Sequence, residues 1–272
     1  MYIINPSELS YKCYHCAHLK HNHGLEDRGI SAGITGELDS IEKKYFLGPA
    51  QKISPEIQEG EVIDADHLGM SFRSKILKDN KGREFVISGK GDALIKFKDK
   101  SHGIIDYKTS KFKEKKTGKR NRYLDFGIKE YSSQLHCYDL LFSNLENNKD
   151  TVKELIKKRF PSWGDEAINK HTVNRLNKIS EISIKKNSLM GLVYVYPEKL
   201  IEDDNLLVHF SYSFEKVKYE PKRFLNILTE YIDNLEKPFP PDIPEKCKNP
   251  KEQQHCIMHA FFYNEKKLQT FK

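Results

Sequence analysis

The sequence has no apolar run long enough to cross a membrane, since a spanning helix needs about 20 such residues in succession. Its first ten residues, MYIINPSELS, also lack the basic and then apolar segments of a secretory signal. We therefore expect a cytoplasmic location and no membrane partner. Hydrophobic residues make up 38% of the chain and charged residues 31%, which is typical of a globular protein.

Cysteine is scarce, with five residues in 272: Cys13, Cys16, Cys137, Cys247 and Cys256. A cytoplasmic protein of this size does not usually depend on disulfides. The Cys13-x-x-Cys16 spacing is instead typical of metal ligands, and Cys247 and Cys256 could complete a set of four thiolates. Such a site would take Zn²⁺ or an iron–sulfur cluster. The alternative is buried cysteines without a ligand, which we expect for Cys137.

The net charge of +7 and the pI of about 8.9 suit a polyanionic partner such as nucleic acid. Most of this positive charge is lysine, and a lysine-rich composition can also reflect an AT-rich genome. The charge is therefore compatible with nucleic-acid binding without requiring it.

Hydrophobic periodicity predicts a single α/β domain over residues 1–272, with no internal repeat. Residues 60–80 fit neither period, and the tail from Pro238 is expected to be irregular. Helices are expected over 7–22, 35–46, 126–145, 151–180 with a break at Pro161, and 220–235, and strands over 189–197 and 206–219. The domain is expected to carry a helical insertion.

The clearest pattern is a β-hairpin made of one strand over 84–97, a polar turn at 98–101 and a return strand over 102–109. Strand side chains alternate between two faces, so Asp106 and Lys108 share a face. The hairpin also brings Asp92 beside Asp106. Gly89 and Gly91 before Asp92 allow a close approach of the backbone.

Two adjacent carboxylates repel each other unless a cation neutralises them, and Mg²⁺ prefers a few carboxylates with water and phosphate. A lysine beside the ion can contact the scissile phosphate or its attacking water. Asp92, Asp106 and Lys108 therefore fit metal-assisted phosphodiester hydrolysis. The alternative is an ordinary surface hairpin, because D-x-K alone is a weak motif.

Three segments in order, GKGDALI, GIIDYKTS and QLHCY, resemble the RecB-type branch of the PD-(D/E)XK nucleases, which includes CRISPR-associated exonucleases. The match runs from Gly89 to Asp92, from Asp106 to Lys108, and to Gln134 and Tyr138, whose i, i+4 spacing places them on one helix face. It covers about residues 84–142. The segment CYHCAHLK is similar to the cysteine-bearing start of other members of that superfamily.

The resemblance implies a restriction-endonuclease-like core, with a central mixed sheet flanked by helices. It implies Mg²⁺ or Mn²⁺ held by Asp92, Asp106 and the backbone carbonyl of Tyr107, with Gln134 and Tyr138 completing the active site. The cysteine-bearing segments 1–25 and 238–272 are expected to pack together. The implied activity is exonucleolytic cleavage of DNA in repair, recombination, phage replication or defence. Any helicase or recombination partner would be a separate chain, since no phosphate-binding loop is present.

RecB-type enzymes often add a ligand from the first helix, for which Glu37, Asp39, Glu42 and His67 are candidates. The alternatives are solvated surface for Glu37 and Glu42, and a cap or salt-bridge partner for Asp39. Likewise, Gln134 could be a surface amide, and Tyr138 a core aromatic with a wet tip.

A basic stretch over 111–122 follows the D-x-K strand and includes Lys115, Lys116, Lys119 and Arg120. From that position it could grip the DNA backbone without reading sequence. Its alternative is a solvated loop. For the whole chain, two other functions compete with a nuclease. One is an inactive nucleic-acid-binding module, and the other is an adaptor held by its terminal cysteines.

Overall fold

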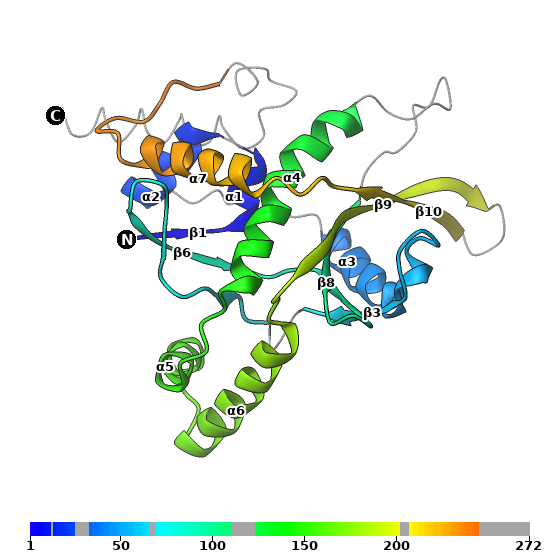
Figure 1. Cartoon of the computed structure of the whole chain (residues 1–272), viewed down its shortest axis with the longest axis horizontal. Coiled ribbons are helices and arrows are strands. Elements are labelled where there is room, and N and C mark those ends of the chain that lie inside the picture. The colour runs from blue at the N-terminus through cyan, green and yellow to red at the C-terminus, as the bar shows by residue number, and fades with distance from the viewer. Residues whose placement is uncertain (12, 25–32, 66–68, 110–122, 202–206, 245–272) are drawn as a thin grey trace.

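The computed structural model describes residues 1–11, 13–24, 33–65, 69–109, 123–201 and 207–244. These residues form a mixed α/β fold with two β-sheets and flanking helices (Figure 1). The larger sheet has six strands in the order β10-β9-β8-β7-β3-β2. They are β2 (Gly48–Pro49), β3 (Gly60–Asp64), β7 (Ala93–Phe97), β8 (His102–Thr109), β9 (Asn187–Ile201) and β10 (Leu207–Lys216). Strands β8 and β9 are parallel and the other neighbours are antiparallel, so the sheet is mixed as expected.

The smaller sheet is centred on β6 (Glu84–Gly89), which pairs in parallel with β1 (Tyr2–Ile4). Two short antiparallel strands, β4 (Phe72–Arg73) and β5 (Leu77–Lys78), also pair with β6. Residues 60–80, which had no clear period, thus contain three short strands. Because these strands are short and belong to two different sheets, the segment shows no continuous alternation of apolar and polar residues.

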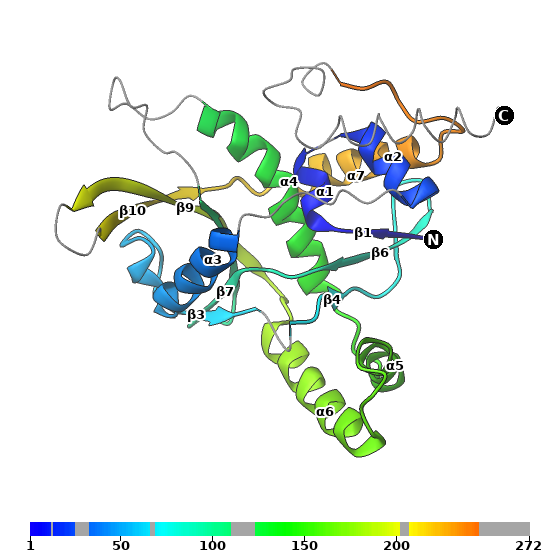
Figure 2. The same ribbon diagram turned by 180° about the vertical axis from the view of Figure 1, so that it is seen from behind.

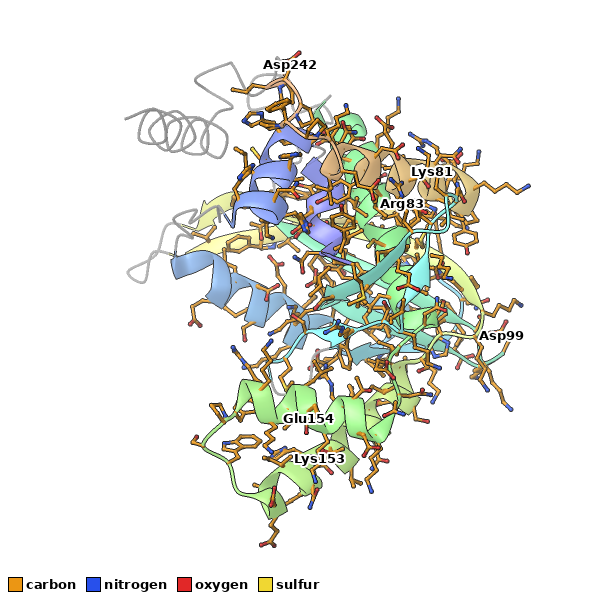
Figure 3. All side chains as sticks on the ribbon, turned by 90° about the vertical axis from the view of Figure 1, so that its left-hand side faces the viewer. Lys81, Arg83, Asp99, Lys153, Glu154 and Asp242 are labelled. Carbon is orange, nitrogen blue, oxygen red and sulfur yellow. The ribbon has the colours of Figure 1, made fainter. Side chains whose placement is uncertain are left out.

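The helices are α1 (Pro6–Tyr11), α2 (Tyr14–His23), α3 (Gly33–Phe46), α4 (Tyr123–Ser143), α5 (Lys149–Arg159), α6 (Asp165–Ile182) and α7 (Pro221–Leu235), with a 3-10 turn at Ala50–Lys52. Helices α5 and α6 project from the body as the expected helical insertion (Figure 1). Helices α1, α2 and α7 gather near α4. Figure 3 shows Lys81 and Arg83 beside α7, and Lys153 and Glu154 far from them on α5.

Two hydrophobic cores cover opposite faces of the β8–β9 pair. Ile104 of β8 packs in the core that includes Leu135 and Leu141 of α4. Ile105 and Tyr107 face the other core, which includes Phe46 of α3. Figure 2 shows α3 over this second face. The alternation along β8 therefore decides which side chains meet α4 and which meet α3.

The prediction of one strand over 84–97 was wrong. Strand β6 ends at Gly89 and β7 begins at Ala93, and the two belong to different sheets. A Cβ on Gly89 would come within 2.7 Å of the Pro6 ring, and one on Gly91 within 2.8 Å of Phe142. The chain therefore changes sheets in a passage between α1 and α4 where larger residues would clash.

The single helix expected over 7–22 was also wrong, because α1 ends at Tyr11 and α2 begins at Tyr14. Cys13 precedes α2 with φ −93° and ψ 88°, outside the helical region, so the chain turns there. The other predicted elements were confirmed within a few residues. Among them, Pro221 occupies the first turn of α7, where its missing N–H costs nothing.

Candidate functional site

Asp92 and Asp106 lie where β7 and β8 stop pairing. Ala93 opposes Ile105 at the end of the ladder, so the two aspartates come next on adjacent strands. The Tyr107 N–H donates to Asp92 Oδ2 at 2.9 Å. The Asp106 side chain is 1% exposed and that of Asp92 is 19% exposed. The hairpin thus places one buried and one accessible carboxylate side by side.

Asp106 and Lys108 share a face of β8 and form an ion pair, with 2.6 Å between Lys108 Nζ and Asp106 Oδ2. Burial raises the pKa of Asp106, and repulsion by Asp92 adds to this effect, while Lys108 opposes it. Burial would lower the pKa of Lys108, but its ion pair and hydrogen bond with Asp106, together with the charge of Asp92, raise that pKa overall. Its ammonium lies 4.5 Å from the centre of the Tyr131 ring, a cation–π contact from α4.

Helix α4 turns Gln134 and Tyr138 into the protein on this same face. Both side chains are buried, and Gln134 Nε2 donates to the Tyr138 hydroxyl at 3.4 Å. The interpretation of Gln134 as a surface amide was therefore wrong. Burial raises the pKa of Tyr138, and the charges of Asp106 and Asp92 raise it further. The Tyr138 hydroxyl thus lies within electrostatic reach of both carboxylates, and Gln134 is its hydrogen-bond partner.

Helix α3 approaches the carboxylates from the other side. Lys43 Nζ lies 3.3 Å from Asp92 Oδ1 and 2.8 Å from Asp39 Oδ2. Of the two alternatives to a metal ligand at Asp39, the salt-bridge partner is confirmed. Sequence reasoning missed Lys43. Its i, i+4 spacing from Asp39 could have indicated that ion pair, but nothing in the sequence indicated its contact with Asp92.

Glu42 is buried, and its Oε1 accepts a hydrogen bond from Thr109 Oγ1 at 3.0 Å. Its interpretation as solvated surface was wrong. Burial raises the pKa of Glu42, and the negative charges of Asp39 and Asp92 contribute. Glu37 is exposed, in keeping with the surface alternative. His67 lies outside the described residues.

The residues present suit a hard divalent cation. Asp106 Oδ2 is buried and faces the Lys108 ammonium, but no well-aligned hydrogen-bond donor reaches it within the described residues. In the same part of the chain, no three His, Cys, Asp or Glu side chains gather as a metal-binding group. Mg²⁺ needs no such cage, since one or two carboxylates with water and phosphate suffice. The Tyr107 carbonyl stays a prediction as a further ligand.

The predicted terminal metal site lies partly outside the described residues. Cys13 and Cys16 are half-buried at the start of α2, whereas Cys247 and Cys256 fall within residues 245–272. Helix α2 contacts the chain after α7, since His15 Nδ1 and His18 Nε2 each lie 2.7 Å from a backbone oxygen, those of Pro241 and Lys237. Cys137 is buried on α4 as expected, and burial raises the pKa of its thiol.

The basic stretch also falls outside the described residues, so the DNA-binding roles of Lys115, Lys116, Lys119 and Arg120 stay predictions. Its point of attachment is described: β8 ends at Thr109, directly after Lys108. A chain that leaves from there begins next to the carboxylates.

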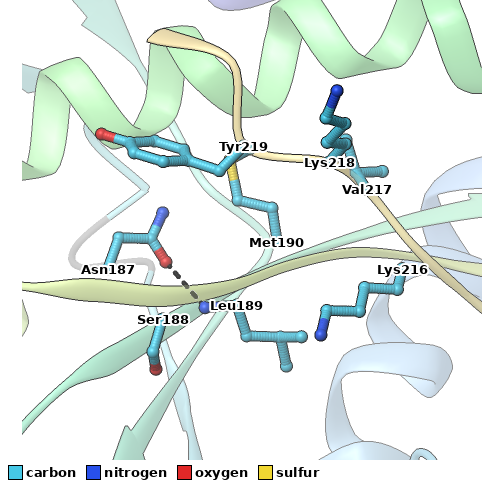
Figure 4. Close-up of a pocket in the computed structure, with 8 residues that line it drawn as sticks. All are labelled: Asn187, Ser188, Leu189, Met190, Lys216, Val217, Lys218 and Tyr219. Carbon is cyan, nitrogen blue, oxygen red and sulfur yellow. Dashed lines mark hydrogen bonds between the residues drawn. The ribbon is translucent and has the colours of Figure 1, made fainter.

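A cavity of about 430 Å³ opens at the other end of β8 and β9 (Figure 4). Asn187 opposes His102 there, whereas Tyr194 opposes Lys108 near the carboxylates. The cavity is lined by Asn187, Ser188, Leu189, Met190, Lys216, Val217, Lys218 and Tyr219. Because no carboxylate is among these residues, it lacks the chemistry of the hairpin site.

No helix in the described part of the chain is long and apolar enough to cross a membrane. No family model matches the sequence, and no curated protein does. Nine chains of solved structures match it. One of them, described as "Crystal structure of SSO0001", has a TM-score of 0.41 and 12% sequence identity, covering 87% of this chain and 77% of that one. This similarity is too low to carry an argument.

Proposed function

We propose that this protein is a metal-dependent nuclease that hydrolyses phosphodiester bonds in DNA, similar to RecB-type exonucleases of the PD-(D/E)XK superfamily. The observation that carries the proposal is the buried pair of Asp106 and Lys108, with Asp92 on the adjacent strand. Burying a carboxylate beside a second one is unfavourable, and such pairs recur where chemistry requires them. Repair, recombination, phage replication and defence all use this reaction.

Asp92 and Asp106, with the carbonyl of Tyr107, would hold Mg²⁺ or Mn²⁺. When bound, the cation supplies charge neutralisation at the phosphate and lowers the pKa of an attacking water. Lys108 would donate from Nζ to a phosphate oxygen or to that water, opposite the charge that develops in the transition state. The Tyr131 ring keeps the ammonium from swinging away, because a cation–π contact favours one position of a flexible side chain.

Gln134 and Tyr138 would position these groups. Their hydroxyl and amide are buried on a helix packed in the main core, and the charges of Asp106 and Asp92 act on the Tyr138 hydroxyl. A rigid helix holds polar groups more precisely than a loop does, and a buried Tyr hydroxyl can orient a carboxylate or water. This role is a positioning one, because both side chains are neutral and would act through hydrogen bonds.

The alternative is a nucleic-acid-binding module with a nuclease-like fold and no activity. Carboxylates repel phosphates, so a binder gains nothing from burying Asp106 beside Asp92. An adaptor protein held by its terminal cysteines would likewise leave the pair of Asp92 and Asp106 unexplained. The carboxylates thus favour cleavage over binding alone.

Cleavage by the purified protein separates these functions. Single-stranded DNA, linear duplex, plasmid and RNA would each be incubated with Mg²⁺, Mn²⁺, Ca²⁺ or EDTA. We expect cleavage with Mg²⁺ or Mn²⁺, little with Ca²⁺ and none with EDTA. Binding of these substrates without cleavage under any metal would instead support the binding module. Products from plasmid as well as from linear DNA would indicate internal rather than terminal cleavage.

A further inference from the structure

Each carboxylate of the candidate site has its own lysine. Lys108 Nζ lies 2.6 Å from Asp106 Oδ2, on the side of α4. Lys43 Nζ lies 3.3 Å from Asp92 Oδ1, on the side of α3. The Tyr107 amide already occupies Asp92 Oδ2. Lys43 therefore faces the Asp92 oxygen that the Tyr107 amide does not engage, and a cation that binds this oxygen would have to displace the ammonium.

Lys43 also has a second partner outside the pair. Asp39 Oδ2 lies 2.8 Å from its Nζ, and the Asp39 side chain is 48% exposed. Asp39 is one helical turn before Lys43, so the two can stay paired while the ammonium moves. Losing Asp92 would consequently not leave Lys43 without a counter-charge.

We propose that Lys43 is a resident counter-ion of Asp92, which a divalent cation must displace, and that Asp39 retains the displaced ammonium. This inference rests on the proposed function, because it assumes that the cation binds at Asp92 and Asp106. It adds a residue that sets the affinity for the metal. Lys43 stabilises the metal-free protein and weakens metal binding by competing for Asp92 Oδ1.

Metal binding can be measured without any cleavage, by titrating Mn²⁺ into the DNA-free protein and following free Mn²⁺ by electron paramagnetic resonance. Lys43→Met should bind Mn²⁺ about threefold more tightly than wild type, since it removes a largely buried ion pair that the cation would otherwise have to break. Lys43→Gln should behave likewise and serves if the methionine variant folds poorly. Lys43→Arg keeps the charge and should stay close to wild type.

Lys44→Met is the matched control, because Lys44 is the next residue on α3, carries the same charge and is exposed. Its Mn²⁺ affinity should equal that of wild type. The titrations would be repeated at about 0.15 and about 0.5 M salt, since salt screens distant charges far more than a contact pair. The gain in Lys43→Met should persist at the higher salt.

Unchanged or weaker Mn²⁺ binding by both Lys43→Met and Lys43→Gln overturns the proposal, as does an equal gain in Lys44→Met. Asp106→Asn distinguishes this failure from a failure of the proposed function. If wild type binds Mn²⁺ and Asp106→Asn does not, the metal site stands even where the role of Lys43 fails. If the two bind Mn²⁺ alike, or neither binds it, the metal site and the role of Lys43 both fail.

Discussion

The backbone amide of Tyr107 holds Asp92 by a hydrogen bond of 2.9 Å to Oδ2, across the junction of β7 and β8. This bond fixes the carboxylate in one orientation before any ligand arrives, and leaves its Oδ1 toward Lys43. A preorganised ligand loses little conformational entropy on binding a cation. Asp92 lies in the short segment between Gly89 and Ala93 where the chain passes from one sheet to the other. This change of sheet therefore also positions a carboxylate of the candidate site.

Asp106→Asn should remove a pH-dependent loss of stability. The folded-state pKa of Asp106 is raised, so its contribution to stability is fully present below the ordinary carboxyl pKa of about 4 and is lost as pH rises through the folded pKa. An amide stays neutral and can donate to Asp92. Urea unfolding without divalent cations should therefore show wild type losing stability between about pH 4 and about pH 7, and the variant losing less. Lower stability of the variant at every pH would mean that the ion pair with Lys108 is structural.

Glu8 should control stability in acid. Its Oε2 accepts from the Tyr231 hydroxyl at 2.9 Å and lies 3.1 Å from His21 Nε2, so it joins α1, α2 and α7. Burial opposes ionisation, yet hydrogen bonds from His21, Lys20 and Asn5 lower the pKa of Glu8 to about 2. A depressed pKa gives stability that is present above the ordinary value of about 4.3 and lost as pH falls toward the folded one.

Glu8→Gln should therefore lower the free energy of unfolding by about 1 to 3 kcal/mol at neutral pH, and flatten its decline below about pH 4. Glu56→Gln is the control, because Glu56 is exposed. Urea unfolding at several pH values measures both. If the free energy of unfolding falls as steeply in acid for Glu8→Gln as for wild type, other carboxylates cause the loss of stability.

Local periodicity was enough to predict α3, α4, the α5–α6 insertion, β9, β10 and α7. Alternation along 102–109 also placed Asp106 and Lys108 on one face. The division of 84–97 between two sheets could not be predicted, because it depends on Pro6 and Phe142, which are distant in the sequence. Apolar residues on both sides of a break look like one strand when the break itself has only glycine and polar residues.

The contribution of α3 to the site was likewise hidden. Phe46 packs against Tyr107 with ring centroids 5.3 Å apart, and this contact sets how α3 lies over the sheet. That placement buries Glu42 against Thr109 and brings Lys43 to Asp92. Helical periodicity shows which residues share a face, but it does not show which residues of a distant strand that face meets.

The stretch after β8 should supply DNA affinity that is independent of sequence. Replacing Lys115, Lys116, Lys119 and Arg120 by glutamine should weaken binding and reduce its salt dependence, because fewer counterions are released. In a matched control variant, glutamine replaces Lys149, Lys157, Lys158 and Arg159. These residues are exposed on α5 and, like the tested set, comprise three lysines and one arginine. Fluorescence anisotropy at several salt concentrations measures, for each variant, the slope of log binding constant against log salt concentration. Equal slopes in the two variants would make the stretch ordinary solvated surface.

The terminal cysteines should bind one metal ion or cluster. Protein purified without oxygen is expected to contain stoichiometric iron or zinc by elemental analysis, and Cys16→Ser should lose it and melt at a lower temperature, because metal binding contributes to folding. Cys137→Ala is the control, since Cys137 is buried on α4 and should not affect metal content. Wild-type protein without metal, and with stability unchanged by chelators, would contradict the prediction.

The catalytic role of Asp106 is tested most directly by comparing DNA cleavage by wild type, Asp106→Asn and Asp99→Asn, each with Mn²⁺ and with EDTA. Asp99 lies in the turn of the same hairpin and accepts hydrogen bonds from Ser101, so its replacement changes charge and local structure away from the site. We expect Asp106→Asn to cleave at least about a hundredfold more slowly, since it loses a group that neutralises transition-state charge. Asp99→Asn should cleave as wild type does. Equal rates for wild type and Asp106→Asn with Mn²⁺ would contradict the assignment.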